Sequence, residues 1–121
     1  MAVGTILIVQ DDFLAAERLR RLLEQAGYVV VGVASRTKGA HELAEKHHPD
    51  LAIIDMMLEV DVDGVHTATA LARLHDMKIL ITTGFPDSVV RAERVHEIAC
   101  AIVKKPYSDE ELLAAVSRCW T

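Results

Sequence analysis

The chain has 121 residues, of which 51% are hydrophobic and 26% charged, so it is long enough to bury the core of one domain without metal or disulfide cross-links. Its formal net charge of -5 argues against a nucleic-acid-binding protein, because such proteins normally present a basic face to the phosphates. The apolar N-terminal residues are too few for a membrane span, which needs roughly 18, and no basic residue precedes them as in a signal peptide, so we expect a cytoplasmic protein without membrane insertion.

Short apolar runs recur along the chain and are separated by segments with helical periodicity. Such runs are typical of parallel strands buried on both faces, although periodicity alone leaves buried helix open as an alternative. The five predicted strands lie at residues 5–9, 28–34, 50–55, 78–82 and 101–104.

Helices are predicted between and after these strands. The first carries apolar residues from 15 to 26 and ends at Gly27, a typical residue after a helix. The second begins at Ser35 or Thr37, either of which can cap it, and ends before Pro49. The last begins with a capping box at residues 108–111. The third and fourth are predicted at residues 64–74 and 86–98.

Strand and helix thus alternate five times over short connections, with no internal linker or repeat. Right-handed crossovers then give an α/β fold, a doubly wound five-stranded parallel sheet with helices on both faces. We therefore expect residues 1–121 to form a single domain.

Polar residues follow the predicted strands, and in an open parallel sheet they meet at the carboxyl ends of the strands. Asp11 follows the first strand and Asp55 ends the third. Two carboxylates that face each other repel, so we expect a divalent cation between them, and few hard oxygen ligands suit Mg²⁺. Thr83 and Lys105 follow the last two strands and offer the hydrogen-bond donor and the positive charge that suit a phosphoryl group.

Each of these residues also has an ordinary interpretation. An aspartate at a strand end is usually a turn residue, Thr83 before a glycine is a common turn, and a lysine such as Lys105 is usually solvated. Asp12 either joins the acidic pair or caps the first helix, where a negative side chain suits the dipole. The functional interpretation is favoured because four strand ends bring complementary chemistry to one place.

These motifs match a known family. The acids after residues 6–9, Asp55 after residues 51–54, and the pairs at residues 63–64, 83–84 and 105–106 occur in the order and spacing that resemble the receiver domain of bacterial two-component response regulators. The resemblance covers essentially the whole chain. It implies a flavodoxin-like sheet with strand order 2-1-3-4-5, and a stand-alone receiver domain of residues 1–121, similar to the chemotaxis regulators, with no output domain.

The resemblance also implies a role for each motif residue. Asp55 would be the phosphoacceptor, with a sensor histidine kinase or a His phosphotransfer protein as the donor. Asp11, Asp55 and the backbone carbonyl of Met57 would bind Mg²⁺. Thr83 would bind one phosphoryl oxygen, and Lys105 would pair with another. Such a domain is a phosphoacceptor in signalling, not an enzyme, and only self-phosphorylation and self-dephosphorylation are expected of it.

Two positions depart from the family pattern. Gln10 occupies the place of the first of two adjacent acids; it can still hydrogen-bond a metal-bound water, but it removes a negative charge, so we expect weaker Mg²⁺ binding. Ile102 occupies a position where the family commonly has Tyr or Phe, so no ring is available to move with Thr83. The peptide bond between Lys105 and Pro106 is expected to be cis, as is frequent in the family.

The downstream partner is unknown. By resemblance, it would bind the face formed by the fourth helix, the fifth strand and the fifth helix. Trp120 belongs either to that face or to the cover of the core. The other candidate contact residues are Val89, Val90, Arg91 and Arg94.

Cys100 and Cys119 lack the spacing of metal ligands, so we expect two reduced thiols in the core and no disulfide. Of the six histidines, His47 and His48 lie in a predicted loop and the other four on separate predicted helices, so they are not expected to form a metal set.

The leading hypothesis is a single-domain response regulator that is phosphorylated on Asp55 and either switches protein–protein contacts or relays the phosphoryl group. The alternative is a pseudo-receiver, a constitutive interaction module whose phosphorylation is impaired by Gln10. A flavin or nucleotide enzyme on the same fold would need a Gly-rich loop after the first strand, which is missing. A phosphohydrolase would normally want an acid where Met57 stands.

Overall fold

The strands of the computed structural model, which describes residues 4–56, 64–92 and 94–120, lie where the apolar runs predict them. They are β1 (Thr5–Val9), β2 (Val29–Ala34), β3 (Leu51–Asp55), β4 (Lys78–Thr83) and β5 (Ala101–Lys104). The helices are α1 (Phe13–Gln25), α2 (Thr37–His47), α3 (Gly64–His75), α4 (Asp87–Ala92), the 3-10 helix η1 (Val95–Glu97) and α5 (Asp109–Arg118).

The five strands form one parallel sheet in the order β2-β1-β3-β4-β5, which confirms the predicted fold class and strand order. β3 lies in the middle and is buried at every residue, as a continuous apolar run requires. Its register with β1 pairs Val9 with Ile54. The next residues of the two strands, Gln10 and Asp55, therefore leave the sheet side by side.

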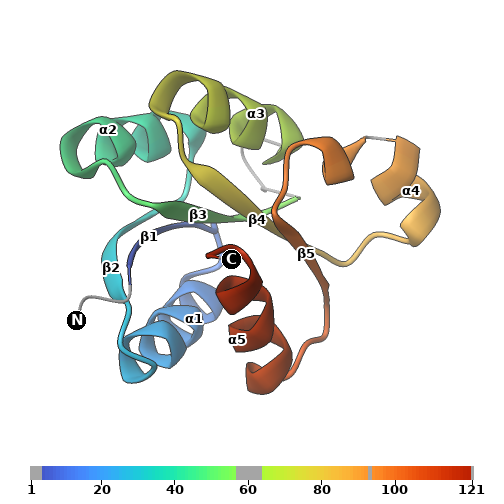
Figure 1. The fold of residues 1–121 in the computed structure, drawn as a ribbon, viewed down its shortest axis with the longest axis horizontal. Helices are drawn as coiled ribbons and strands as arrows, with labels where there is room; N and C mark the ends of the chain where they lie inside the picture. Colours follow the sequence, from blue (N-terminus) through green and yellow to red (C-terminus); the bar gives the residue numbers. More distant parts are fainter. Residues whose placement is uncertain (1–3, 57–63, 93, 121) are drawn as a thin grey trace.

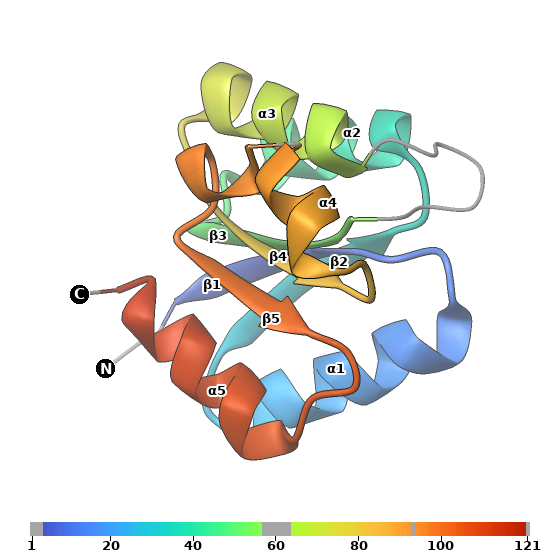
Figure 2. The same cartoon turned by 90° about the vertical axis from the view of Figure 1, so that its right-hand side faces the viewer.

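Helices cover both faces of the sheet (Figures 1 and 2), with α1 and α5 on one face and α2, α3 and α4 on the other. Alternate residues of each strand supply the two apolar layers. In β1, Ile6 and Ile8 pack against α1 and α5, whereas Leu7 and Val9 pack against α2 and α3. The middle of the sheet is thus buried from both sides.

The ends of α1 and α5 follow the sequence signals. Asp12 caps α1 by accepting the backbone N–H groups of Leu14 and Ala15 on Oδ1, at 3.0 and 3.2 Å. This contact confirms the helix cap as one of the two roles left open for Asp12. Gly27 follows α1 with φ of 98°, in the left-handed region that glycine adopts without strain. The capping box at the start of α5 is also present.

The predicted caps of α2 were wrong. The N-cap position belongs to Arg36, without a side-chain hydrogen bond, and Thr37 is the first helical residue. The Thr37 hydroxyl instead lies 2.7 Å from the hydroxyl of Thr67 on α3, so it links two helices.

The predicted helix over residues 86–98 is two shorter elements. α4 ends at Ala92, and the separate 3-10 helix η1 begins at Val95. Arg94 between them has φ of 57°, a left-handed backbone conformation that interrupts a right-handed helix.

The expectation of two reduced cysteines was also wrong. Cys100 and Cys119 form a disulfide, with their Cα atoms 5.3 Å apart. Cys100 directly precedes β5, and Cys119 is the C-cap of α5. Because α5 returns along β5, its last turn comes to lie beside the start of that strand (Figure 2).

Candidate functional site

The carboxyl ends of the strands surround a cavity of about 690 Å³. Asp55, the last residue of β3, is only 6% exposed and points into this cavity. The loop after β1 and the start of α1 form one wall, and the segments after β4 and β5 form the other. The lining residues are Gln10, Asp11, Asp12, Ala15, Asp55, Gly84, Phe85 and Lys105.

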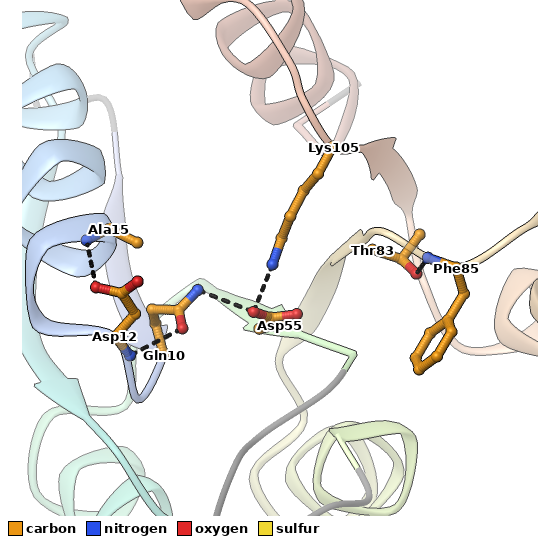
Figure 3. A network of polar contacts seen from close by, with 7 residues as sticks. All are labelled: Gln10, Asp12, Ala15, Asp55, Thr83, Phe85 and Lys105. Carbon is orange, nitrogen blue, oxygen red and sulfur yellow. Dashed lines mark hydrogen bonds and ion pairs between the residues drawn. The ribbon is translucent and has the colours of Figure 1, made fainter.

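Two side chains converge on one oxygen of Asp55 (Figure 3). Lys105 donates from Nζ to Oδ2 at 2.6 Å, and Gln10 donates from Nε2 to the same oxygen at 3.0 Å. The Asp55 side chain is 7% exposed, whereas that of Lys105 is 39% exposed. A carboxylate this deeply buried needs such partners, because an unpaired buried charge is costly. The site thus places a buried carboxylate oxygen beside a lysine ammonium group.

Gln10 plays a part that the sequence did not predict. We expected it to contact a metal-bound water, but its amide bonds Asp55 directly, while its Oε1 accepts the backbone N–H of Asp12 at 3.0 Å. Since Oε1 must face that N–H, the amide can present only its donor to Asp55. Gln10 therefore connects the carboxylate to the start of α1.

Thr83 lies at the predicted strand end but does not line the cavity. It is fully buried, and its hydroxyl accepts the backbone N–H of Phe85 at 3.0 Å (Figure 3). Its carbonyl accepts the backbone N–H of Lys105 at 2.8 Å, which fixes the end of β5 against β4. The peptide bond between Lys105 and Pro106 is cis, as predicted.

Three further lining residues were not predicted as site residues. Ala15 belongs to the first turn of α1, and Gly84 and Phe85 follow Thr83. Gly84 and Phe85 could have been found, because they directly follow a predicted strand end. Met57, whose carbonyl was expected to bind metal, and Asp63 of the motif at residues 63–64 lie outside the described residues.

The donor set of the cavity fits a hard divalent cation. Asp11 and Asp55 both line it, and one or two carboxylates are what Mg²⁺ usually takes from a protein. Within residues 4–56, 64–92 and 94–120, no group of three or more His, Cys, Asp or Glu side chains could hold a metal. Mg²⁺ held by one or two carboxylates usually keeps several of its waters.

A second cavity, of about 460 Å³, adjoins the first and shares Ala15 and Lys105 with it. Tyr107 lines this cavity, between α1 and the start of α5. Burial, and then the negative charge of Asp55, raise the pKa of Tyr107 above its usual 10.0. Tyr107 therefore stays a neutral hydroxyl group in the lining of the second cavity.

The predicted partner face contains both buried and accessible residues. Val90 is only 4% exposed and packs in the core, so its assignment to the surface was wrong. Arg91 and Arg94 are exposed. Lys104 bonds Asp87 at 2.9 Å, and this hydrogen bond and the lysine charge lower the pKa of Asp87. The pair joins β5 to α4.

Trp120 is partly exposed, and its ring lies 5.4 Å from that of Tyr28. It packs on Tyr28, which itself packs against the core layer of α1 and α5, so this contact favours the second of its two expected roles, the cover of the core. Ile102 is partly buried against the layer of α2 and α3.

Two of the histidines meet between α2 and α3, where His41 Nδ1 and His75 Nε2 are 3.1 Å apart. Burial, and then the neighbouring His75, lower the pKa of His41 below its usual 6.5.

Over the described part of the chain, no helix is long and apolar enough to cross a membrane.

Comparison with known proteins identifies the relatives of this chain. Residues 6–117 match the family model described as the response regulator receiver domain. The chain is 35% identical over 113 residues to the transcriptional regulatory protein PdtaR of Mycobacterium tuberculosis, a match that covers 92% of this chain and 54% of PdtaR. The chain therefore spans about half the length of that relative. It is 26% identical over 114 residues to protein CcdB of Bacillus subtilis, covering 93% of this chain and 94% of CcdB.

A solved structure of a receiver domain is also similar to this chain. The signal receiver domain of a modulated diguanylate cyclase from Desulfovibrio desulfuricans is 32% identical and has a TM-score of 0.85, with 96% of this chain and 92% of that chain covered.

Proposed function

Because the chain belongs to the response regulator receiver domain family of two-component systems, we propose that residues 1–121 act as a receiver domain that accepts a phosphoryl group on Asp55. The donor is a sensor histidine kinase or a His phosphotransfer protein. The observation that carries this proposal is the buried carboxylate of Asp55, which lines a cavity and has Lys105 Nζ at 2.6 Å. We place this activity in the cytoplasm, where such kinases deliver phosphoryl groups.

The chemistry is a displacement at phosphorus. A carboxylate oxygen of Asp55 attacks the phosphorus of a phosphohistidine, the P–N bond breaks as the P–O bond forms, and the imidazole leaves with the bonding electron pair. The product carries about 1.5 to 2 negative charges, as phosphorylated side chains do. Lys105 stabilises this charge from a position it already holds, so little reorganisation is needed. Thr83 would donate its O–H to a phosphoryl oxygen, because the hydrogen bond that it accepts from the N–H of Phe85 uses only a lone pair of the hydroxyl oxygen.

Receiver domains bind Mg²⁺ for phosphorylation, and Asp11 and Asp55 would hold it here. The ion would supply positive charge to the phosphoryl oxygens. Gln10 gives the site one negative charge fewer than an acid at the same place would, so the site would bind Mg²⁺ more weakly than a receiver domain with both acids.

Phosphorylation then changes a protein contact. The new charge beside Lys105 and Thr83 alters the segments after β4 and β5, which lead into α4 and α5. A downstream protein, or the next carrier in a relay, binds the face formed by α4, β5 and α5. The net charge of -5 makes nucleic acid an unsuitable partner.

A second candidate function has its own observation. Gln10 already occupies one oxygen of Asp55 with a hydrogen bond of 3.0 Å, and this favours a pseudo-receiver that binds its partner constitutively. The two candidates differ in whether Asp55 reacts.

The test is the intact mass of the chain after incubation with a small acyl phosphate or a phosphohistidine-bearing donor, with and without Mg²⁺. We expect one added phosphoryl group that depends on Mg²⁺ and is absent from Asp55→Asn. Asp50→Asn, in the exposed residue just before β3, is the matched control and should be phosphorylated normally. No added mass with either donor would favour the pseudo-receiver.

A further inference from the structure

The disulfide between Cys100 and Cys119 lies outside the phosphorylation site. It joins the residue before β5 to the C-cap of α5, whereas Asp55 and Lys105 lie at the opposite, carboxyl end of the sheet. In Figure 2 the start of β5 and the end of α5 lie together on the side of the two chain termini. The bond therefore fixes the last turn of α5 to the strand beside it.

The two cysteines differ in accessibility. Cys100 is exposed, whereas Cys119 is only 2% exposed and packs with Leu112, Ala115 and Val116 of α5. Thiol–disulfide exchange requires an attacking thiolate to reach one of the sulfur atoms. An external thiolate can reach Cys100, so Cys119 is the leaving group.

The fold also suits the reduced form. The Sγ atom of Cys100 lies 3.1 Å from the carbonyl oxygen of Ile79, so a thiol at this position has an acceptor for its weak S–H donor. Cys119 lies among apolar side chains, where a free thiol behaves as a small hydrophobic group. Reduction thus removes the cross-link but leaves both side chains with suitable surroundings.

The surroundings of Cys119 are held by further contacts. Lys78 donates from Nζ to the carbonyl oxygen of Cys119 at 2.6 Å. The next residue, Trp120, packs on Tyr28 at 5.4 Å between ring centroids. These contacts do not depend on the cross-link, so they would keep the end of α5 on the sheet after reduction, and any movement there would change the surroundings of Trp120.

We propose that Cys100 and Cys119 form a reversible thiol–disulfide site whose reaction partner is a thiol or disulfide, such as a small monothiol or a dithiol protein. In oxidation, the two thiols give two electrons and two protons to an external disulfide, which leaves as two thiols. Reduction runs in reverse through a mixed disulfide on Cys100. Disulfides in a reducing cytoplasm are usually transient and redox-sensing. The cytoplasmic location of the chain rests on the proposed function. The geometry of the two cysteines is independent of that function.

The experiment is a redox titration of the full chain in buffers with defined ratios of reduced to oxidised glutathione. Samples are quenched with acid, alkylated and weighed intact, so that free thiols are counted. We expect a continuous transition from no alkylated thiol to two, while far-UV circular dichroism stays native. A disulfide that survives excess reduced glutathione in the native protein would overturn the proposal, as would two thiols that stay reduced in excess oxidised glutathione.

Two single variants test the order of attack. Cys119→Ser keeps the exposed Cys100 and should form a mixed disulfide with glutathione readily. Cys100→Ser keeps the buried Cys119, and its reaction with glutathione should be slower by about tenfold or more, because thiol reactivity follows exposure. Equal rates would contradict attack at Cys100. The wild-type titration should be unchanged in Asp55→Asn, so this inference and the phosphorylation proposal fail independently.

Discussion

The side-chain amide of Gln10 donates to Oδ2 of Asp55 at 3.0 Å and so stands as a neutral partner where an acid would repel. Its other end accepts the backbone N–H of Asp12, the residue that caps α1. The carboxylate, the amide and the helix start thus form one hydrogen-bonded chain. This arrangement stabilises the buried carboxylate of Asp55. It also offers a cation less negative charge than an acid in place of Gln10 would.

Substituting Gln10 by glutamate should tighten Mg²⁺ binding. One unit charge at about 4 Å and an effective dielectric of 20 is worth roughly 4 kcal/mol before screening and solvation. After those losses we expect about a tenfold gain in affinity, which corresponds to about 1.4 kcal/mol. Isothermal titration calorimetry of Gln10→Glu measures it, with Gln25→Glu at the exposed end of α1 as the control. Equal affinity in wild type and Gln10→Glu would contradict the account.

Removing the charge of Lys105 should slow phosphorylation of Asp55. The lysine lies 2.6 Å from the carboxylate and is positioned to stabilise the charge of the phosphoryl group. Because its side chain is partly solvated, we expect Lys105→Gln to lower the rate by about tenfold, at the modest end for such electrostatic groups. The neighbouring Lys104→Gln, which loses only the exposed pair with Asp87, is the control. Rates measured with one small phosphodonor should separate the two variants.

Stability should fall as the pH is lowered past 6.5 because of His41. Burial and then His75 lower its pKa in the folded state below the usual 6.5, so the unfolded chain binds the proton more readily. The stabilising contribution of neutral His41 is present in full above that value and is lost as the pH falls below it. Denaturant unfolding between about pH 7.5 and 5.5 should show this loss, and His41→Gln should reduce it.

The exposed His66 of α3 provides the matched variant for this test. His66→Gln should keep the full pH dependence of the wild type. A wild-type slope that persists in His41→Gln would assign the effect to other groups.

The disulfide should contribute measurably to stability. It closes a loop of 19 residues, and in the chain-entropy model a loop of that length is worth about 3 kcal/mol. Cys100→Ser is the suitable variant, because Cys100 is exposed and the change buries no hydroxyl group in the core. Urea unfolding should show the loss relative to the oxidised wild type, and a reductant should have no further effect on the variant. Equal free energies of unfolding would mean that the loop is already ordered without the bond.

The sequence was sufficient for the fold and for most of the site. Continuous apolar runs such as residues 51–54 specify buried strands, and parallel strands bring their carboxyl ends together, so Asp11, Asp55 and Lys105 could be assigned to one cavity before any coordinates. The direction of a side chain is a different matter. The contact of Gln10 with Asp55 depends on the register of β1 with β3 and on the N–H of Asp12, neither of which a residue type reveals.

Two further failures have physical reasons. The left-handed conformation of Arg94 has no sequence signal, since arginine has no preference for it. The pairing of Cys100 with Cys119 does have a signal in the sequence, because a helix that follows a parallel strand returns along that strand. Cys119, directly after α5, therefore lies beside Cys100, directly before β5, although 19 positions separate them.

The central claim is that Asp55 carries the phosphoryl group. Borohydride reduces an aspartyl phosphate to homoserine, so the phosphorylated chain can be reduced, digested and sequenced by tandem mass spectrometry. The account predicts homoserine in place of Asp55 and at no other aspartate, with none in a sample that received no phosphodonor. Homoserine in place of Asp11 or Asp12, or none anywhere after phosphorylation, would contradict it.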